Sequence, residues 1–322
     1  MSVETEVVLD RRRLRRGMSF WRALALLVLL IAGGMLLNGS TDIARLFGQK
    51  QIARVSITGT ITEDRKQLKL FKKIAESESV EALLLYVNSP GGTTTGGEAI
   101  YESLREIAKT KPVVAQFGTV AASAGYIAGL GADHIVARGN TITGSVGVLL
   151  QWPEVTQLLE KIGVTMHTVR SGPLKAKPSP LEPLDDEGRQ IAKGMIEEGF
   201  GWFLSLVEER RKLTVASVPG LKQGSIYSGR KALELNLIDE IGGEDEAIAW
   251  LVKERGVTAD LEVVDWVVAD DGGWGGSSAF SGAIGGLFGK NAGKLAELLG
   301  QDKFVSTLTL DGMVSVWHPQ EN

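Results

Sequence analysis

The chain has 322 residues, 43% of them hydrophobic and 23% charged, so it is long enough to bury the core of one large or two ordinary domains. Its 35 Lys and Arg against 39 Asp and Glu give a net charge of -4, which argues against a protein built to neutralise nucleic-acid phosphates. The lack of cysteine excludes disulfides, thiolate metal sites and Cys nucleophiles, and the three histidines form no HExxH pair. We therefore expect no metal, no cofactor and no nucleic-acid partner.

The N-terminal segment has the charge and hydropathy pattern of a membrane anchor. Five arginines within residues 11–16 precede the uncharged run Ala23–Leu37, and the apolar stretch reaches back to Met18 with one charge, Arg22, near its end. We predict a transmembrane helix over residues 18–38. The positive-inside rule makes residues 1–17 a cytoplasmic basic tail and places the remainder on the far side of the membrane.

A cleaved secretory signal and a buried core helix are the alternatives to an anchor. The only A-x-A motif near the apolar run, Ala23–Ala25, lies at its start rather than at its end, where a cleavage site belongs. A core helix is seldom preceded by five arginines in six residues. Both observations favour the uncleaved anchor.

From Ile52 onward, short β-like runs alternate with amphipathic helices, which is the pattern of an α/β domain with a largely parallel sheet. The continuous apolar run Ala82–Val87 is typical of a strand covered on both faces. We expect strands at 54–57, 82–87, 113–117, 134–137, 148–150 and 164–169, and helices at 68–76, 97–109, 121–129, 154–162, 185–212, 229–235 and 245–255. The folded domain is predicted to occupy residues 39–269.

The C-terminal region, residues 270–322, differs in composition. Nine glycines fall between Gly272 and Gly293, with a Trp and two Phe among them. We expect this region to be a flexible linker or a membrane-grazing arm rather than part of the core.

A glycine-rich turn, Asn88–Gly92, follows the strand expected at 82–87. Gly91 and Gly92 free two backbone N–H groups and let a ligand approach closely, as an oxyanion hole or an anion nest requires. Pro-Gly-Gly is also an ordinary turn, so both interpretations stay open.

Ser123 stands among small residues where a strand is expected to pass into a helix. Its hydroxyl would lie near a helix N-terminus, whose partial positive charge favours a developing oxyanion. The alternative is a structural serine that caps the helix or permits tight packing. The segment is not the nucleophile elbow of α/β-hydrolases, because Ala121 rather than glycine lies two residues before the serine.

A nucleophilic serine needs a base, and the histidines are poor candidates. His134 and His167 fall inside expected strands, and His318 lies in the tail. A lysine acts as a base only where burial lowers its pKa toward neutrality, in a mostly apolar pocket. Lys175, which follows an expected strand and turn in a region of few charges, and Lys177 are the candidates. A solvated loop residue is the alternative for each.

Ser228 and Lys231 form the only Ser-x-x-Lys sequence in the chain, the spacing used by penicillin-binding proteins. The companion motifs Ser-Asp-Asn and Lys-Thr-Gly are missing, so we expect Ser228 to cap the helix that follows. The sequence also contains no Walker A motif, no GxGxxG after a strand and no EF-hand loop.

Between about Val55 and Val257 the chain resembles the signal peptide peptidase A family, membrane-bound bacterial serine proteases with a Ser-Lys dyad, in its short single-repeat form. The matching stretches, in order, are Leu85–Gly92, Ala121–Tyr126, Thr143–Val148, Ser171–Lys175, and Gly229–Ala232 with Leu237–Gly242. Five matches in the same order make the resemblance specific.

The resemblance implies a Clp-protease-like, crotonase-type α/β fold with Ser123 as nucleophile and Lys175 as general base. In that family the base lysine follows a Ser-Gly-x-x pattern, which Lys175 fits and Lys177 does not. The oxyanion hole would use the N–H groups of Gly91 and Ala124. The implied substrates are released signal peptides and other unfolded hydrophobic segments.

The resemblance also implies a place and an assembly. The protein would lie in the bacterial inner membrane, with its catalytic domain on the periplasmic side. Longer members of the family carry two copies of the repeat, so a single copy implies a homo-oligomeric ring in which neighbouring chains share the site. Pro173, a stiff neighbour for the base lysine, and the Gly-rich tail depart from the family pattern.

Two further functions are alternatives. A crotonase-like acyl-CoA enzyme would use the same backbone donors, although the anchor and the Ser123/Lys175 pair argue against it. A catalytically inactive, ring-forming scaffold of the same fold would use the surface for binding alone.

Overall fold

The computed structural model describes residues 49–268 and 314–316. The predicted transmembrane segment, His318 and the stretch from Gly272 to Gly293 lie outside the described residues. Within the described ranges, no helix is long and apolar enough to cross a membrane.

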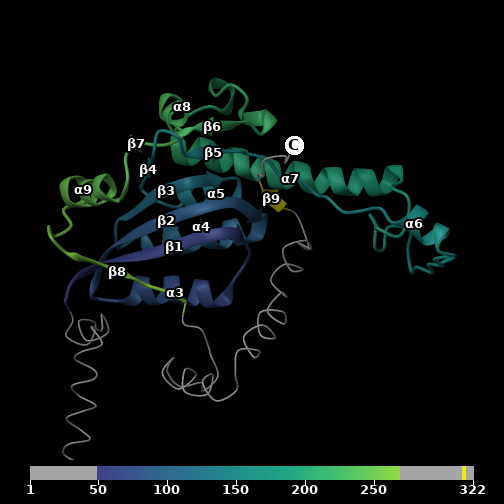
Figure 1. The fold of residues 1–322 in the computed structure, drawn as a ribbon, viewed down its shortest axis with the longest axis horizontal. Helices are drawn as coiled ribbons and strands as arrows, with labels where there is room; N and C mark the ends of the chain where they lie inside the picture. Colours follow the sequence, from purple (N-terminus) through teal and green to yellow (C-terminus); the bar gives the residue numbers. More distant parts are fainter. Residues whose placement is uncertain (1–48, 269–313, 317–322) are drawn as a thin grey trace, which may run out of the picture. The chain divides into compact units, whose positions relative to one another are not determined.

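A mixed sheet, nine-stranded in the described part of the chain, runs through the domain (Figure 1). Its main path has the order β6-β5-β3-β2-β1-β8; β4 pairs with β3 and β7, and β9 pairs with β2. The β5–β6 and β2–β9 pairs are antiparallel and the others parallel. The strands are β1 (Gln51–Ile61), β2 (Val80–Thr93), β3 (Val113–Ala122), β4 (His134–Ala137), β5 (Ile142–Gly144), β6 (Ile226–Ser228), β7 (Glu240–Ile241), β8 (Glu262–Asp265) and β9 (Val314–Val316).

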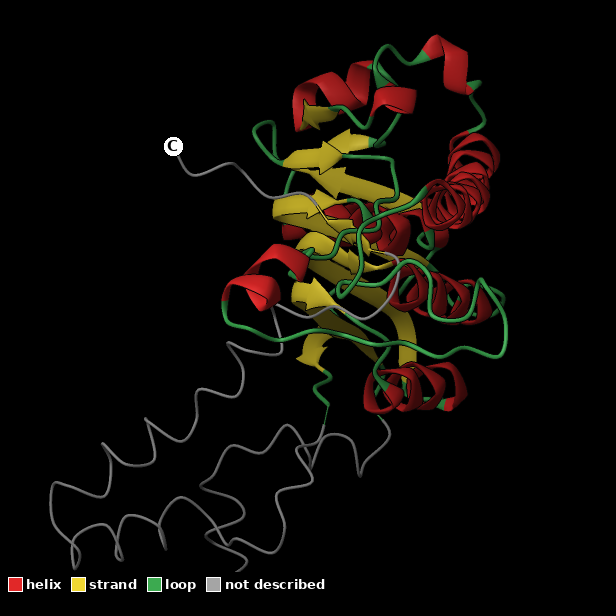
Figure 2. Cartoon of the chain, turned by 90° about the vertical axis from the view of Figure 1, so that its right-hand side faces the viewer, coloured by secondary structure: helices red, strands yellow, loops and turns green. Residues whose placement is uncertain are grey.

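Helices cover both faces of this sheet, unequally, as the edge-on view in Figure 2 shows. The helices are α3 (Arg65–Glu76), α4 (Thr94–Ile107), α5 (Ala124–Leu130), α6 (Thr156–Lys161), α7 (Asp186–Arg211), α8 (Gly229–Glu234) and α9 (Glu244–Arg255), with 3-10 turns η1 (Val215–Ser217) and η2 (Leu221–Gln223). The larger core lies between the sheet and helices α3, α4, α5 and α7. A smaller cluster on the opposite face packs under Ala247 and Leu251 of α9.

The period-2 alternation of side chains decides which residues enter each core. In β1, Ala53, Val55 and Ile57 join the larger cluster, whereas Ile52 joins the cluster under α9. The strand expected at 82–87 is β2, whose apolar side chains enter both clusters, as a strand buried on both faces requires.

Two expected strands are wrong, and one expected helix begins too early. No strand forms at 164–169, and at 148–150 only residue 149 makes an isolated bridge. Residues 164–169 belong to a segment, 150–185, whose apolar side chains are largely exposed, and Leu149 just before it is also exposed, so no sheet face selects the alternation of these residues. The helix expected at 121–129 begins at Ala124, because Ala121 and Ala122 pair with β5 as the last residues of β3.

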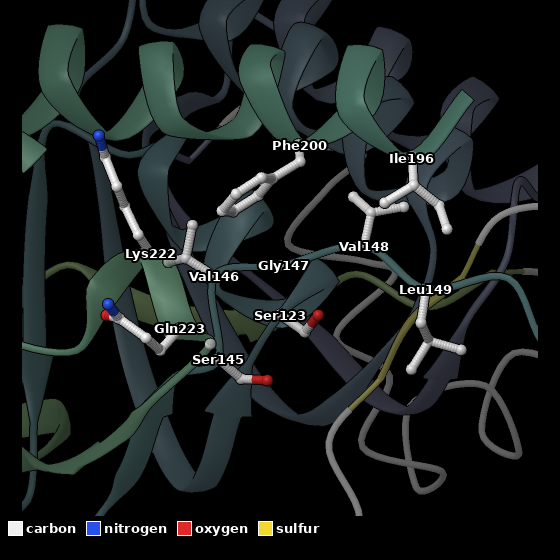
Figure 3. A pocket seen from close by; sticks show the side chains of 11 residues that line it. Ser123, Ser145, Val146, Gly147, Val148, Leu149, Ile196, Phe200, Lys222 and Gln223 are labelled. Atoms are coloured by element: carbon white, nitrogen blue, oxygen red, sulfur yellow. The ribbon is translucent and has the colours of Figure 1, made fainter. Parts of the chain in front are cut away.

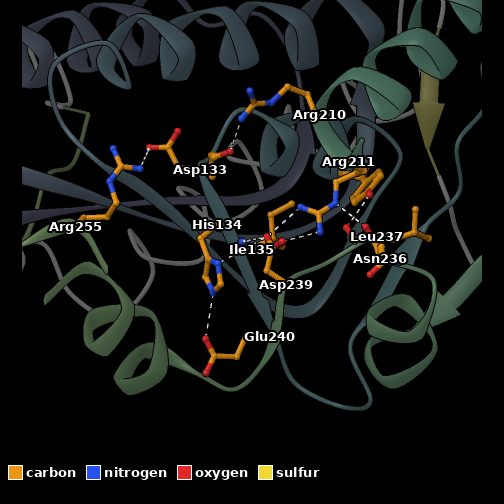
Figure 4. Close-up of polar contacts among 12 residues, drawn as sticks. Asp133, His134, Ile135, Arg210, Arg211, Asn236, Leu237, Asp239, Glu240 and Arg255 are labelled. Atoms are coloured by element: carbon orange, nitrogen blue, oxygen red, sulfur yellow. Dashed lines mark hydrogen bonds and ion pairs between the residues drawn. The ribbon is translucent and has the colours of Figure 1, made fainter. Parts of the chain in front are cut away.

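A network of charged residues holds the β4 edge of the sheet (Figure 4). Asp133 accepts from Arg105 at 3.0 Å and pairs with Arg255 at 3.2 Å. Asp239 accepts from the guanidinium of Arg211 at 2.7 Å and from the backbone N–H of residue 135 at 2.8 Å. The network ties α4, α7 and α9 to β4, the strand with which β7 pairs.

Two glycines in helices have opposite surroundings and therefore give a matched test of this packing. A Cβ atom at Gly129 of α5 would lie 2.3 Å from the buried ring of Phe117, whereas a Cβ atom at Gly194 of α7 would meet nothing within 4 Å. We expect Gly129→Ala to lower the free energy of unfolding by about 1–3 kcal/mol through overpacking. Gly194→Ala should raise it by about 0.5–1 kcal/mol by restricting the unfolded chain. Denaturant unfolding of the full chain measures both, and equal stabilities of the two variants would contradict this packing.

Candidate active site

Ser123 lies at the junction between β3 and α5 in a backbone conformation that is unusual for serine. Its φ is 57° and its ψ is -119°. Its N–H donates to the Gly144 carbonyl at 2.9 Å, and its carbonyl accepts from the Ile127 N–H at 2.9 Å. A left-handed non-glycine residue costs free energy and persists only where the surrounding structure fixes it, which is common at functional sites.

The side chain of Ser123 does not cap helix α5. It makes no capping hydrogen bond with the first turn of α5, so the helix-capping interpretation of this serine is wrong. The residue is nevertheless 1% exposed. The absence of a capping bond leaves tight packing and chemistry as the two roles open to this buried hydroxyl.

Small residues bring α5 close to the end of β2. A Cβ atom at Gly125 would lie 2.9 Å from the Ser89 carbonyl oxygen, and one at Gly97 of α4 would lie 3.2 Å from the Ala124 side chain. Tyr126 fixes the helix from its other side, because its hydroxyl donates to the Leu237 carbonyl at 2.8 Å. Burial raises the pKa of this phenol, so Tyr126 stays a neutral donor.

A cavity of about 400 Å³ opens beside Ser123 (Figure 3). The hydroxyl groups of Ser123 and Ser145 lie at one side of it, and Ile196 and Phe200 of α7 face them from the other. Lys222 also lines the cavity, but its amino group points away from Ser123. The remaining wall consists of Val146, Gly147, Val148, Leu149, Gln223 and Gly224. The cavity can hold an apolar side chain next to a serine hydroxyl.

The two predicted oxyanion donors have different surroundings. The Ala124 N–H belongs to the first turn of α5, where backbone N–H groups lack intrahelical acceptors. The Gly91 N–H donates to Ser89 Oγ at 3.1 Å, and Gly91 has a φ of 125°. Its neighbour Gly92 has no room for a side chain, since a Cβ atom there would lie 1.8 Å from the Ile61 carbonyl oxygen. An oxyanion at Gly91 therefore has to compete with the Ser89 hydroxyl.

Comparisons with known proteins identify the family. The model of peptidase family S49 matches residues 105–258, and that of Clp protease matches residues 41–139. A Synechocystis sp. protein named as a protease is 37% identical over 220 residues, 68% of this chain and 79% of that protein. A Methanocaldococcus jannaschii protein, also named as a protease, is 31% identical over 265 residues, 77% of this chain and 85% of that protein. The chain belongs to peptidase family S49.

A third S49 relative carries the name that the motifs indicated. A protein of Enterococcus faecium named as a signal peptide peptidase, SppA, is 35% identical over 237 residues, 67% of each chain. The resemblance to the signal peptide peptidase A family is thus confirmed, together with a Clp-protease-like α/β fold. The sheet is mixed rather than built from parallel pairs alone.

The two candidate lysines of this S49 chain lie in very different environments. Lys175 is exposed in a turn and does not line the cavity beside Ser123. Lys177 forms ion pairs with Asp185 and, at 2.7 Å, with Glu187. The Asp185 carboxylate and then Glu187 raise the pKa of Lys177, which keeps the amine protonated and unable to accept a proton.

The Ser-x-x-Lys sequence has the structural role expected for it. Ser228 Oγ accepts from the Lys231 N–H at 3.3 Å and so caps α8. The amino group of Lys231 donates to Glu234 at 2.7 Å, on the surface of the same helix turn. These two residues do not form a nucleophile–base pair.

The described histidines lie apart from Ser123 in the architecture. His134 is in β4 as expected, stacks on Trp250 with ring centroids 4.6 Å apart, and contacts Glu240 at 3.1 Å (Figure 4). His167 is exposed in the 150–185 segment, outside any strand. Neither lines the cavity beside Ser123.

Sequence reasoning missed Ser145, Ile196 and Phe200 as parts of this site. Ser145 has a φ of 52°, and its N–H donates to the Ser225 carbonyl at 2.9 Å. The matched stretch Thr143–Val148 was the available signal for Ser145. The sequence contains no such signal for Ile196 and Phe200, because an apolar residue on an amphipathic helix is normally interpreted as part of the core.

The strained backbone of Ser123 leads to a stability prediction. Glycine adopts a positive φ without steric cost, whereas alanine retains the strain of serine. We expect Ser123→Gly to unfold at a higher temperature than Ser123→Ala. Its free energy of unfolding should be larger by about 1 kcal/mol, which is the relief of strain less the entropy cost of glycine. Thermal unfolding of both full-length variants tests this, and a less stable glycine variant would show that Ser123 is unstrained.

Proposed function

We propose that this S49 protein is a membrane-anchored serine endopeptidase that uses Ser123 and Lys175 to cut released signal peptides and other unfolded hydrophobic segments. The conformation of Ser123 is the observation that carries the proposal: a strained, buried serine that does not cap its helix and borders an apolar cavity. The family and the signal peptide peptidase name of a relative support the reaction and the substrate class.

In the proposed reaction, the neutral amine of Lys175 takes the proton of Ser123 as Oγ attacks the scissile carbonyl carbon. The N–H groups of Ala124 and Gly91 hold the resulting oxyanion. Collapse of the intermediate breaks the C–N bond, and the lysine ammonium protonates the leaving amine. Water, deprotonated by the same lysine, then hydrolyses the ester and restores Ser123.

The β2–β9 pair supports the binding of an extended substrate. β9 runs antiparallel to Gly91–Thr93. At Gly91 and Gly92, one edge of β2 is paired with β1, so β9 must lie on the other edge. β3 pairs with that same edge earlier in β2, and β3 ends just before Ser123. An extended chain can therefore pair with β2 next to the nucleophile, and a substrate strand is proposed to use the same edge.

The position of Lys175 supports a site shared between subunits. Figure 1 shows α6 and the N-terminal end of α7 projecting beyond the sheet, and Lys175 belongs to the 150–185 segment that includes α6. This segment exposes a set of apolar side chains: Leu158, Ile162, Val164, Met166, Val169, Leu174 and Leu181. An exposed apolar surface of this kind favours contact with another chain. We propose that it packs on the next copy in a ring and delivers Lys175 to that copy's Ser123.

Complementation between inactive variants tests the shared site. Ser123→Ala and Lys175→Ala are each expected to lose several orders of magnitude in peptide hydrolysis, because the two groups act as one unit. Mixed and reassembled, they should regain activity, since a ring then contains a wild-type Ser123 beside a wild-type Lys175. Turnover of a fluorogenic peptide measures the recovery.

Two variants serve as controls for that experiment. Lys177→Ala and Ser228→Ala should keep most of the activity, because Lys177 is ion-paired and Ser228 caps α8. If Lys177→Ala is inactive while folded, the assignment of the base is wrong. A mixture as inactive as its parents, with subunit exchange verified, would place both dyad residues in one chain.

The predicted anchor leads to a topology experiment. Because the arginines of residues 11–16 favour the cytoplasm, protease added to spheroplasts should digest the domain after residue 39 and leave only the short basic tail protected. Immunoblotting with tags at both termini measures the fragments. Protection of the whole domain would contradict the proposed orientation.

A further inference from the structure

A second cavity, of about 430 Å³, lies on the face of the sheet that α9 covers. Tyr86 of β2 and Gln116 of β3 are paired neighbours in the sheet. By strand alternation they share the face of Leu84 and Val114, which pack under α9. The complete lining is Arg54, Ser56, Tyr86, Gln116, Arg138, Glu244 and Asp265. The cavity beside Ser123, by contrast, is lined from α7, which packs on the opposite face.

Gln116 is the unusual residue of this cavity. It is only 7% exposed, yet its side-chain amide makes no hydrogen bond with any residue that the structure describes. The hydroxyl of Tyr86 likewise has no hydrogen-bond partner within the described ranges. The Gln116 amide is not among the fully buried, unpartnered side-chain groups of the described residues, so its polar atoms reach the open space of the cavity that it lines. An amide that lines a cavity without a hydrogen bond to the described residues, beside a phenol with a spare donor and acceptor, is suited to a ligand that contains a peptide group.

The charges of the cavity show which end of a peptide would fit. Arg54 is neutralised within the wall, since it donates to Asp265 at 2.6 Å and to Glu244 at 2.8 Å. Arg138 forms no hydrogen bond or ion pair through its guanidinium with the described residues. The guanidinium lies close to Gly243, and the pKa of Glu246 is lowered first by the backbone N–H of Gly243 and last by the charge of Arg138. It is therefore available for a carboxylate, the group that arginine binds with two parallel hydrogen bonds.

We propose that this cavity binds the carboxyl end of a short peptide, with the terminal carboxylate on Arg138 and the adjacent peptide group on Gln116 and Tyr86. Carboxylate and amide are adjacent in every such ligand, and the cavity is large enough for a few residues. The proposal is independent of the dyad, since it concerns a different face of the sheet.

Calorimetry on the full-length Ser123→Ala chain in detergent tests the proposal without hydrolysis. The probes are N-acetyl-Ala-Ala with a free carboxylate and the same dipeptide as its C-terminal amide. We expect the carboxylate to bind at least about tenfold more tightly, because a hydrogen bond to a charged group is lost in the amide. Arg138→Gln should weaken carboxylate binding about 10- to 100-fold, and Gln116→Leu about 3- to 10-fold.

Two controls distinguish a peptide site from a general charge effect and from a purely structural glutamine. Arg65→Gln, a change of an exposed arginine on α3, should leave binding unaltered. Gln116→Leu should also leave the unfolding temperature unchanged or raise it, because it removes no hydrogen bond to the described residues and adds apolar surface at a nearly buried position. A structural glutamine would give the opposite result, a lower unfolding temperature.

Three outcomes would overturn the proposal. The first is no measurable binding of the carboxylate probe, and the second is equal affinity for carboxylate and amide. The third is binding that Phe200→Ala abolishes and Arg138→Gln leaves intact, which would place the peptide in the cavity beside Ser123.

Discussion

Ser123 has a φ of 57° where β3 turns directly into α5, and several neighbours must hold that conformation in place. The Gly144 carbonyl fixes its N–H, Gly125 lets the helix touch the end of β2, and Tyr126 ties the helix to Leu237. The result is a buried hydroxyl at one end of a rigid junction, beside a cavity lined from α7. The proposed chemistry depends on this turn, because only there do the nucleophile and the first N–H groups of α5 meet.

The domain divides the proposed dyad between two kinds of structure. The serine lies in the close-packed body, whereas Lys175 lies in the exposed 150–185 segment with its apolar surface. A packed core gives the nucleophile a fixed geometry. In the proposed ring, an exposed segment gives the base to a neighbour and makes activity depend on assembly. A single subunit would then be inactive, which confines hydrolysis to the assembled enzyme.

The two faces of the sheet carry different sites for a simple geometric reason. Adjacent residues of a strand point to opposite faces, so β2 and β3 build the large core on one side and the Tyr86/Gln116 cavity on the other. Helix α9 covers the other face over Leu84 and Val114. Two residues further along each strand, the side chains on this face are polar: Tyr86 follows Leu84 and Gln116 follows Val114. Gln116 is nearly buried and has no side-chain hydrogen-bond partner among the described residues.

The sequence determined the elements that have a strong local signal. The strand at His134–Ala137 and the helices α3, α4, α7 and α9 follow from periodicity, and α8 also from its cap Ser228, because these signals depend on neighbours along the chain. Motifs also indicated Ser123 and the family. Periodicity could not locate β5, β6 and β7, which have two or three residues and exist through their pairing with distant strands.

Only the tertiary structure decided the surroundings of the candidate site. Lys175 and Lys177 are two residues apart in the sequence, but folding gives Lys177 two carboxylates from α7 and its N-cap and leaves Lys175 exposed. Phe200 reads as an ordinary core residue until α7 places it opposite Ser123. The physical reason is that burial, the pKa of a lysine and the shape of a cavity depend on residues distant in the chain, whereas caps and periodicity depend on near ones.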